Sequence, residues 1–389
     1  MSKVSIVQTR GDDYPAIKSA VKKAIDFIGG LSDIIQPGNR VLIKPNLLGV
    51  PEFRLSGAVT RWEVCKAIYE EVLNVGGKPF IAESASIGAD TEDVILFCGY
   101  SRLREEGFEV IDLKSGNYEN DVLKPDNPLL YNELHTWKPV VDADVIISVP
   151  VMKTHDQTEV TLGLKNLKGL ISDSEKKQFH SLGVTDGVVD IVKVLKPALT
   201  IFDGTYGQEG MGPMFGDTVK MDLIIASKDV VACDSVASKL MGYEPNEVGI
   251  LVSAAKCGLG FMDIEDIDIV GDTIEQHRRK FKRANETTIQ GVPSSFEIVW
   301  NETACTGCRN TIISCLLKIK EDKLLDKLSG KFAVAGSLKR EELPEICSKE
   351  NTVLIGKCAA ALEECGYNNA VLGCPPRNIN VIEGLIGEK

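Results

Sequence analysis

The stretch Val41-Leu42-Ile43-Lys44-Pro45-Asn46 decides the fold class of this chain. Three large aliphatic residues in a row are typical of a buried strand, and the polar residues and proline that follow end it. Helical patterns flank this strand on both sides, at about Tyr14–Ile28 and at Trp62–Val75. Because buried strands that alternate with helices form parallel sheets with crossover helices, we predict an α/β protein.

The same alternation continues to about residue 290. Short apolar runs end at polar residues or glycine, and helical patterns separate several of them. The predicted strands are Val4–Gln8, Pro79–Ala82, Val110–Asp112, Val145–Val149, Leu199–Phe202 and Leu223–Ala226, and the predicted helices include Val188–Val194 and Val230–Leu240. We therefore expect a mostly parallel sheet as the core of an N-terminal domain that covers residues 1–290.

A second, smaller α/β domain is predicted over residues 291–389. The segment between Asp272 and Gln290 is highly charged and favours a solvated helix that leads to a domain boundary. From about Val292 the apolar runs resume, and helical patterns separate them. The predicted strands of this domain are Phe332–Ala335, Val353–Ile355 and Ala370–Leu372.

Composition excludes some classes of partner. The 389 residues carry a formal net charge of −12, which argues against nucleic acid and against a polybasic membrane anchor. No stretch approaches the roughly 20 uninterrupted apolar residues that span a bilayer. The first residues show no charged-then-apolar signal pattern, so we expect a cytoplasmic protein.

Eleven cysteines are present, and seven of them follow residue 300. A reducing cytoplasm disfavours a disulfide framework, so metal ligation is the sharper hypothesis. Cys305-Thr306-Gly307-Cys308 is a C-x-x-C motif, while Cys358 and Cys374 each follow a predicted strand. Because strand ends of a parallel sheet share one edge, these four thiolates are expected to meet and to ligate an iron–sulfur cluster, [4Fe–4S] or [2Fe–2S]. We take [4Fe–4S] as the expected cofactor.

Alternatives stay open for this cysteine set. Cys315 follows Cys308 on a helical pattern and could replace Cys358 as the fourth ligand. Structural zinc and a redox dithiol are the competing chemistries. Zinc sites commonly include histidine, and no histidine follows His277.

A cationic anion-binding cleft is predicted in the N-terminal domain. Polar residues stand where predicted strands end, and strand ends converge at one edge. Candidates for substrate binding are Lys44, Asn46, Lys165, Asn166 and Lys168. Candidates for catalysis, which would supply protons and charge stabilisation, are Lys153, His155, His180 and Asp203. Such a cleft suits a small carboxylate or phosphate.

Two further features have structural interpretations beside functional ones. The glycines between Gly204 and Gly216 form a glycine-rich loop that could cradle an anion or act as a mobile flap. The segment matches neither a dinucleotide-binding fingerprint nor a Walker A motif. Asp229 precedes a predicted helix, and we interpret it as the helix N-cap rather than as a catalytic residue.

Several of these segments form a recognisable combination: Lys44-Pro45-Asn46, Lys153-Thr154-His155, Lys165-Asn166-Leu167-Lys168-Gly169, Asp203-Gly204 with Gly212-Pro213 and Gly216, and Asp229 with Asp234. Together they resemble the DUF362 family, a domain of unknown function, over roughly residues 35–262. That family often occurs with iron–sulfur modules, so the resemblance implies an iron–sulfur protein of anaerobic type. The tail departs from ferredoxin spacing and is similar to a variant cluster domain. The N-terminal part is also distantly similar to the lactate racemase family, but it lacks that family's histidine-rich motifs.

Three function hypotheses follow. In the first, the chain is an oxidoreductase-type enzyme that acts on a small anionic substrate at a cleft between the domains, or a lyase that uses an open iron site. In the second, it is a cluster-bearing electron-transfer or accessory protein with no substrate of its own. In the third, it is a zinc-stabilised binding protein. A redox partner protein and a homo-oligomer are compatible with the first two.

Overall fold

The computed structural model divides by its contacts into two compact units. The described residues are 1–286, 289–301 and 303–387, without the side chains of residues 180, 181, 285 and 306. Unit 1 comprises Met1–Thr154, Val160–Lys176 and Thr185–Phe281, and unit 2 comprises His155–Glu159, Lys177–Val184 and Lys282–Lys389. The boundary predicted between residues 290 and 291 lies inside the last of these segments. Two short internal segments also belong to unit 2.

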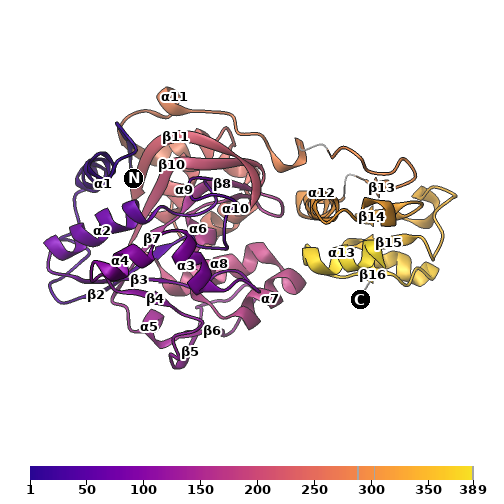
Figure 1. Ribbon diagram of the computed structural model, residues 1–389, viewed down its shortest axis with the longest axis horizontal. Helices are drawn as coiled ribbons and strands as arrows, with labels where there is room; N and C mark the ends of the chain where they lie inside the picture. Colours follow the sequence, from indigo (N-terminus) through magenta and orange to yellow (C-terminus); the bar gives the residue numbers. More distant parts are fainter. Residues whose placement is uncertain (287–288, 302, 388–389) are drawn as a thin grey trace. The chain divides into compact units, whose positions relative to one another are not determined.

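A large, mostly parallel sheet forms the core of unit 1 (Figure 1). In spatial order its strands are β12 (Ile267–Gly271), β1 (Ser2–Gln8), β11 (Phe215–Ser227), β10 (Leu199–Met211), β7 (Val145–Val149), β2 (Arg40–Pro45), β3 (Lys78–Glu83) and β4 (Val110–Asp112). The pairs from β10 through β4 are parallel, whereas β11 is antiparallel to both of its neighbours. The predicted α/β class with a mostly parallel sheet is confirmed.

Helices cover the sheet and bury its apolar residues. Helices α1 (Tyr14–Phe27) and α2 (Trp62–Asn74) pack against each other and contribute to one core with inward residues of the central strands. Asp13 begins α1 by accepting a hydrogen bond from the backbone N–H of Ala16. Helix α9 (Val230–Leu240) packs against β1, β10 and β11. Asp229 accepts a hydrogen bond from the N–H of Ala232 at the start of α9, so the predicted N-cap is confirmed.

The remaining elements are shorter. The α-helices are α3 (Thr91–Phe97), α4 (Ser101–Glu105), α5 (Lys138–Val141), α6 (Gly163–Asn166), α7 (Asp173–Leu182), α8 (Val184–Leu195), α10 (Gly249–Lys256) and α11 (Ile274–His277). Strands β5 (Asn120–Leu123) and β6 (Leu134–Trp137) form a separate hairpin, and β8 (Val151–His155) pairs with β10 and β9 (Glu159–Thr161). The 3₁₀-helices before residue 290 are η1 (Leu167–Leu170), η2 (Pro245–Glu247), η3 (Ile264–Asp266) and η4 (Ala284–Glu286). The solvated helix predicted between Asp272 and Gln290 is therefore limited, among the described residues, to α11 and η4.

The glycine-rich segment is a strand hairpin, so its prediction as a loop was wrong. Strand β10 continues from Leu199 to Met211 and pairs antiparallel with β11 as far as Phe215. A Cβ on Gly207 would lie 2.6 Å from the carbonyl oxygen of Met152, and one on Gly212 would lie 1.9 Å from that of Thr154. Glycine is therefore required here because neighbouring backbones approach closely.

Unit 2 contains its own four-stranded parallel sheet. Its order is β13 (Glu297–Trp300), β14 (Phe332–Ala335), β15 (Thr352–Ile355) and β16 (Ala370–Val371), so the three predicted strands are confirmed. Helices α12 (Thr306–Glu321) and α13 (Asn378–Ile386) lie side by side against this sheet and share one apolar core with it (Figure 1). The 3₁₀-helix η7 (Lys357–Cys365) packs on a second core. The other 3₁₀-helices are η5 (Leu325–Leu328) and η6 (Arg340–Glu342).

None of the helices in the described part of the chain is both long enough and apolar enough to cross a bilayer.

Candidate functional site

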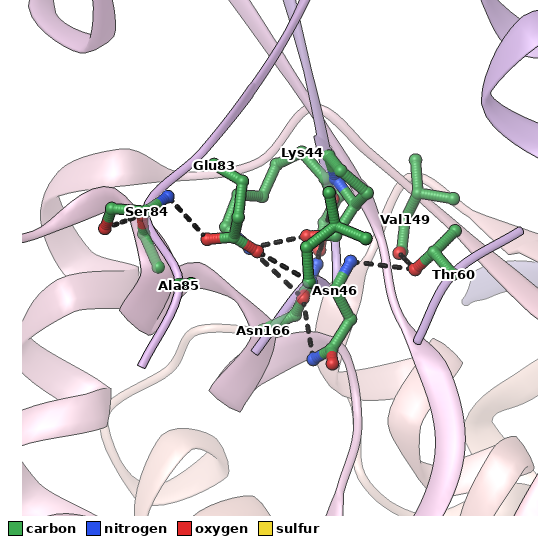
Figure 2. A network of polar contacts seen from close by, with 12 residues as sticks. Lys44, Asn46, Thr60, Glu83, Ser84, Ala85, Val149 and Asn166 are labelled. Carbon is green, nitrogen blue, oxygen red and sulfur yellow. Dashed lines mark hydrogen bonds and ion pairs between the residues drawn. The ribbon is translucent and has the colours of Figure 1, made fainter. Parts of the chain in front are cut away.

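A buried ion pair joins the ends of two neighbouring parallel strands in unit 1. Lys44 stands near the end of β2 and Glu83 at the end of β3, and Lys44 Nζ lies 2.7 Å from Glu83 Oε2 (Figure 2). Both side chains are buried, with exposures of 1% and 3%. Glu83 also accepts hydrogen bonds from the N–H groups of Leu47 and Ser84, so its carboxylate is well compensated.

Two asparagines extend this network. Asn166, the last residue of α6, donates from Nδ2 to the carbonyl of Lys44 and to the hydroxyl of Ser148, both at 3.0 Å. Its Oδ1 accepts from Asn46 Nδ2 at 3.2 Å and from Lys44 Nζ at 3.4 Å (Figure 2). The structure thus brings together three of the residues predicted to bind substrate, Lys44, Asn46 and Asn166.

Lys153, a predicted catalytic residue, lies in the same network. It is fully buried, and its Nζ donates to Asn46 Oδ1 at 3.0 Å and to the carbonyl of Ala58 at 2.6 Å. Burial lowers the pKa of Lys153 well below its ordinary value, and the carboxylate of Glu83 offsets only part of that effect. Burial also lowers the pKa of Lys44, again against the opposing charge of Glu83.

Asp203 is joined to this network through one backbone segment. Thr60 Oγ1 accepts from the N–H of Asn46 at 2.7 Å and donates to the carbonyl of Val149. The next residue, Arg61, donates its backbone N–H to Asp203 Oδ2 at 2.8 Å. Burial raises the pKa of Asp203, while the hydroxyl of Thr205 and the N–H of Arg61 act in the opposite direction. Sequence analysis missed Thr60, because a loop residue has no periodic pattern to reveal it.

The two remaining lysines of the predicted site are more exposed to solvent than Lys44 and Lys153. Lys165 and Lys168 are half-buried, whereas Asn166 between them is fully buried. Burial and the neighbouring charge of Lys176 lower the pKa of Lys168 to about 8. Lys176 itself donates to the carbonyl and hydroxyl oxygens of Ser84, so it fixes the turn after β3.

Both predicted histidines belong to segments assigned to unit 2. His155 belongs to unit 2, where its Nδ1 lies 2.9 Å from Asp156 Oδ1 and 2.9 Å from the N–H of Gln157. The side chain of His180 lies outside the described residues. The predicted catalytic set is therefore divided, with Lys153 and Asp203 in unit 1 and His155 in unit 2.

The C-x-x-C motif stands at the start of α12 in unit 2. Cys305 is the exposed N-cap residue and Cys308 is buried in the first turn. A hydrogen bond from the Cys308 thiol lowers the pKa of Cys305 to about 5, with the N–H groups of Cys308 and Gly307 acting in the same direction. The pKa of Cys308 is raised by its hydrogen bond to Cys305, by burial and by the charges of other cysteines, including Cys374 and Cys358.

Backbone hydrogen bonds join the segments that precede Cys358 and Cys374. The N–H of Gly356 donates to the carbonyl of Val371, and that of Lys357 donates to Gly373, each at 3.0 Å. Gly356 has φ +93°, and a Cβ there would lie 2.7 Å from Cys308 Sγ. Glycine at this position therefore leaves room beside the thiols that a side chain would fill.

The donor set can be compared with the iron–sulfur group that the family resemblance implies. Four cysteine thiols and a glycine that leaves space beside one of them fit such a group in chemistry. In the described portion of the chain, no three His, Cys, Asp or Glu side chains are arranged to hold a metal ion. Ligation would therefore require thiol rotation, which is open to Cys305, Cys358 and Cys374 because all three are exposed.

Cys315, the alternative fourth ligand, lies in the apolar core of unit 2. It is buried, and its thiol donates to the carbonyl of Asn378 at 3.4 Å. Burial raises its pKa well above the ordinary value. This environment favours a structural role for Cys315.

The fold and the strand-end network define an α/β protein with a buried polar centre at one edge of its sheet. Residues 41–239 match the family model described as "Domain of unknown function (DUF362)", and the chain belongs to this family. The resemblance inferred from the sequence is thereby confirmed.

Two individual proteins are also similar. The "Thylakoid-associated protein sll1697" of Synechocystis is 31% identical over 264 residues, which cover 66% of this chain and 79% of that protein. Among solved structures, the lactate racemase apoprotein from Thermoanaerobacterium thermosaccharolyticum matches with a TM-score of 0.39 and 14% identity. That match covers 61% of this chain and 57% of the racemase chain, and similarity at this level supports no functional conclusion.

Replacing both members of the buried ion pair should lower the free energy of unfolding by less than the sum of the two single replacements. Glu83→Gln leaves the ammonium of Lys44 uncompensated and should lower the free energy of unfolding by about 3–5 kcal/mol. Lys44→Met should also destabilise the protein. The loss of unfolding free energy in the double variant should be smaller than the sum of the two single losses by about 1–3 kcal/mol. Urea unfolding followed by circular dichroism measures this coupling.

The exposed pair Lys22–Asp26, with atoms 3.0 Å apart on α1, is the matched control for that cycle. Its coupling should be only about 0.3–0.5 kcal/mol, because solvent screens the charges. Equal coupling energies in the two pairs would contradict the claim that burial strengthens the Lys44–Glu83 interaction.

Gly169→Ala should destabilise unit 1 by overpacking. A Cβ at Gly169 would lie 1.8 Å from Glu83 Oε1 and 2.7 Å from Lys44 Cε, so the ion pair would have to shift. We expect a loss of about 1–3 kcal/mol in unfolding free energy, measured by urea titration. Gly249→Ala in α10 is the control, since its nearest neighbour would be 3.9 Å away. A loss no larger than that of the control would refute the packing argument.

Cys305 should be the first thiol alkylated in reduced, metal-free protein. Because its pKa is about 5, it is mostly thiolate at pH 7, and its iodoacetamide reaction rate should level off above about pH 6. Ordinary cysteines, with a pKa of about 8.5, should still react faster as the pH rises to 9. Peptide mass spectrometry assigns the modified site, and Cys365, which is also exposed, serves as the internal comparison.

Proposed function

We propose that unit 2 holds a [4Fe–4S] cluster on Cys305, Cys308, Cys358 and Cys374. We further propose that the protein is an oxidoreductase-type enzyme acting on a small anionic substrate, a carboxylate or a phosphate. When bound, such a cluster supplies one-electron redox chemistry. The eleven cysteines are compatible with a cluster in a reducing compartment, so the cytoplasm is the proposed location.

One observation carries the cluster proposal. The charges of Cys358 and Cys374 both act on the thiol of Cys308, which shares a hydrogen bond with Cys305. These interactions, together with the backbone bonds that join the segments before Cys358 and Cys374, support one shared site for thiols from three segments. Four cysteines in one neighbourhood are the usual ligand complement of an iron–sulfur cluster.

The chain itself contributes charge stabilisation at this place. The first turn of α12 directs backbone N–H groups toward Cys305, and the partial positive charge of a helix N-terminus favours a thiolate. The turn at Gly356 keeps side chains away from Cys308. The helix N-terminus therefore favours a thiolate at Cys305, and the turn leaves space beside Cys308.

Unit 1 supports the proposal of an anionic substrate. Its strand-end network contains two buried lysines but one carboxylate in direct contact with them, Glu83. Lys168, with a pKa of about 8, remains mostly protonated near pH 7 and is only half-buried. An anion that approaches Lys168 would meet a cation able to attract it and to give up a proton.

A second candidate is a cluster-bearing electron-transfer or accessory protein without a substrate of its own. The complete burial of Lys153 favours it, because both of its hydrogen bonds are made to protein oxygens. Binding zinc on the same thiols would instead make a zinc-stabilised binding protein.

Protein purified without oxygen should contain about four irons and four sulfides per chain. Its visible absorption should bleach with dithionite and return on oxidation. Cys358→Ser should lose most of the iron, because one of four ligands is removed. Cys365→Ser, in the same 3₁₀-helix, and Cys315→Ser should both retain it. Iron and sulfide analysis with visible spectroscopy measures these outcomes.

Each alternative gives a different result in that experiment. Zinc without sulfide, in a colourless preparation, would replace the cluster proposal with the zinc-stabilised protein. Loss of iron in Cys315→Ser but not in Cys358→Ser would reassign the fourth ligand. Iron that resists dithionite would argue against redox use.

A further inference from the structure

A glutamine distant in sequence from the cysteines lies between two thiol-bearing segments of unit 2. Gln157 belongs to the short segment His155–Glu159, which the contacts assign to unit 2. Its Nε2 donates to Thr311 Oγ1 at 3.1 Å, and Thr311 stands on α12 three residues after Cys308. The same Nε2 donates to Asn378 Oδ1 at 3.1 Å and lies 3.5 Å from the carbonyl of Pro376.

These contacts join the two segments that carry three of the proposed ligands. Thr311 lies on the helix that begins at Cys305, whereas Pro376 follows Cys374 by two residues. The carbonyl oxygen of Gln157 would be 3.4 Å from a Cβ on Gly307, the residue before Cys308. The backbone of Gln157 therefore lies near the C-x-x-C turn, and its side chain bonds to both segments.

Asn378 forms a second set of bonds beside the first. Its Nδ2 donates to Ser314 Oγ at 2.9 Å and to Asp156 Oδ2 at 3.4 Å. The start of α13 is thus tied to α12 and to the residue that precedes Gln157. Because these groups are largely buried, a bond lost here is not replaced by water without cost.

We propose that Gln157 is a positioning residue for the thiol site. Its amide fixes the turn that carries Cys374 against the helix that carries Cys305 and Cys308. This inference rests on the proposed function, since it concerns the ligand set of that site. Hydrogen bonds from residues outside the ligand set orient the metal ligands. Their loss typically weakens metal affinity by about 10–100-fold.

Gln157→Met tests the inference, because methionine keeps the length of the side chain and removes the amide. Gln208→Met is the matched control, a buried glutamine of unit 1 whose amide donates to the carbonyl of Met214. Reduced, metal-free full-length protein is titrated anaerobically with Co²⁺, and binding is measured from thiolate-to-cobalt charge-transfer absorption. Iron and sulfide contents of each variant as purified are measured in parallel.

We expect Gln157→Met to weaken Co²⁺ binding by on the order of 10-fold. Its charge-transfer band should also change shape, while Gln208→Met behaves as wild type. Far-ultraviolet circular dichroism verifies folding, and Thr311→Val, which removes only the acceptor hydroxyl, is the second variant if Gln157→Met fails to fold. Thr311→Val should weaken binding in the same direction.

The outcomes separate this inference from the proposed function. Wild-type Co²⁺ affinity and band shape in folded Gln157→Met, or in Thr311→Val in its place, would overturn the inference and leave the cluster proposal intact. Wild-type protein that binds Co²⁺ on these thiols but contains no iron or sulfide as purified would overturn the cluster proposal alone. Wild-type protein that binds no Co²⁺ through its thiols would overturn both.

Discussion

The burial of Lys44 and Glu83 is the constraint on which the centre of unit 1 depends. Removing either ion from water costs several kcal/mol, and only close partners repay that cost. The pair contact of 2.7 Å and the N–H groups of Leu47 and Ser84 supply those partners. Strands β2 and β3 must therefore end side by side, and residue 169 must lack a side chain.

The same pair sets the electrostatics of its neighbours. Lys153 lies beside Asn46 and Ala58, whose oxygens are neutral, while Glu83 is already in contact with Lys44. An ammonium at Lys153 would therefore be buried among neutral oxygens. For this reason burial lowers the pKa of Lys153, and the charge of Glu83 offsets only part of that effect.

The sequence predicts the convergence of strand-end residues but not the contacts that fix them. Lys44, Asn46 and Lys153 could be placed together because apolar runs reveal strands and parallel strands share an edge. The extent of β10 was missed, because glycines were interpreted as loop residues, whereas Gly207 serves the close approach of Met152. Gln157 gave no signal at all, since its partners lie 154 and 221 residues further along the chain.

The position of Gln157 also bears on how the family domain and the cysteine-rich tail are related. The family match covers residues 41–239 and so includes the segment that bonds to Thr311 and Asn378. A buried amide that loses its partners pays its full desolvation cost, so this segment and the tail constrain each other's sequence. Unit 2 thus includes a segment from the family-matched region as well as the tail. A different tail in its place would need acceptors for the amide of Gln157.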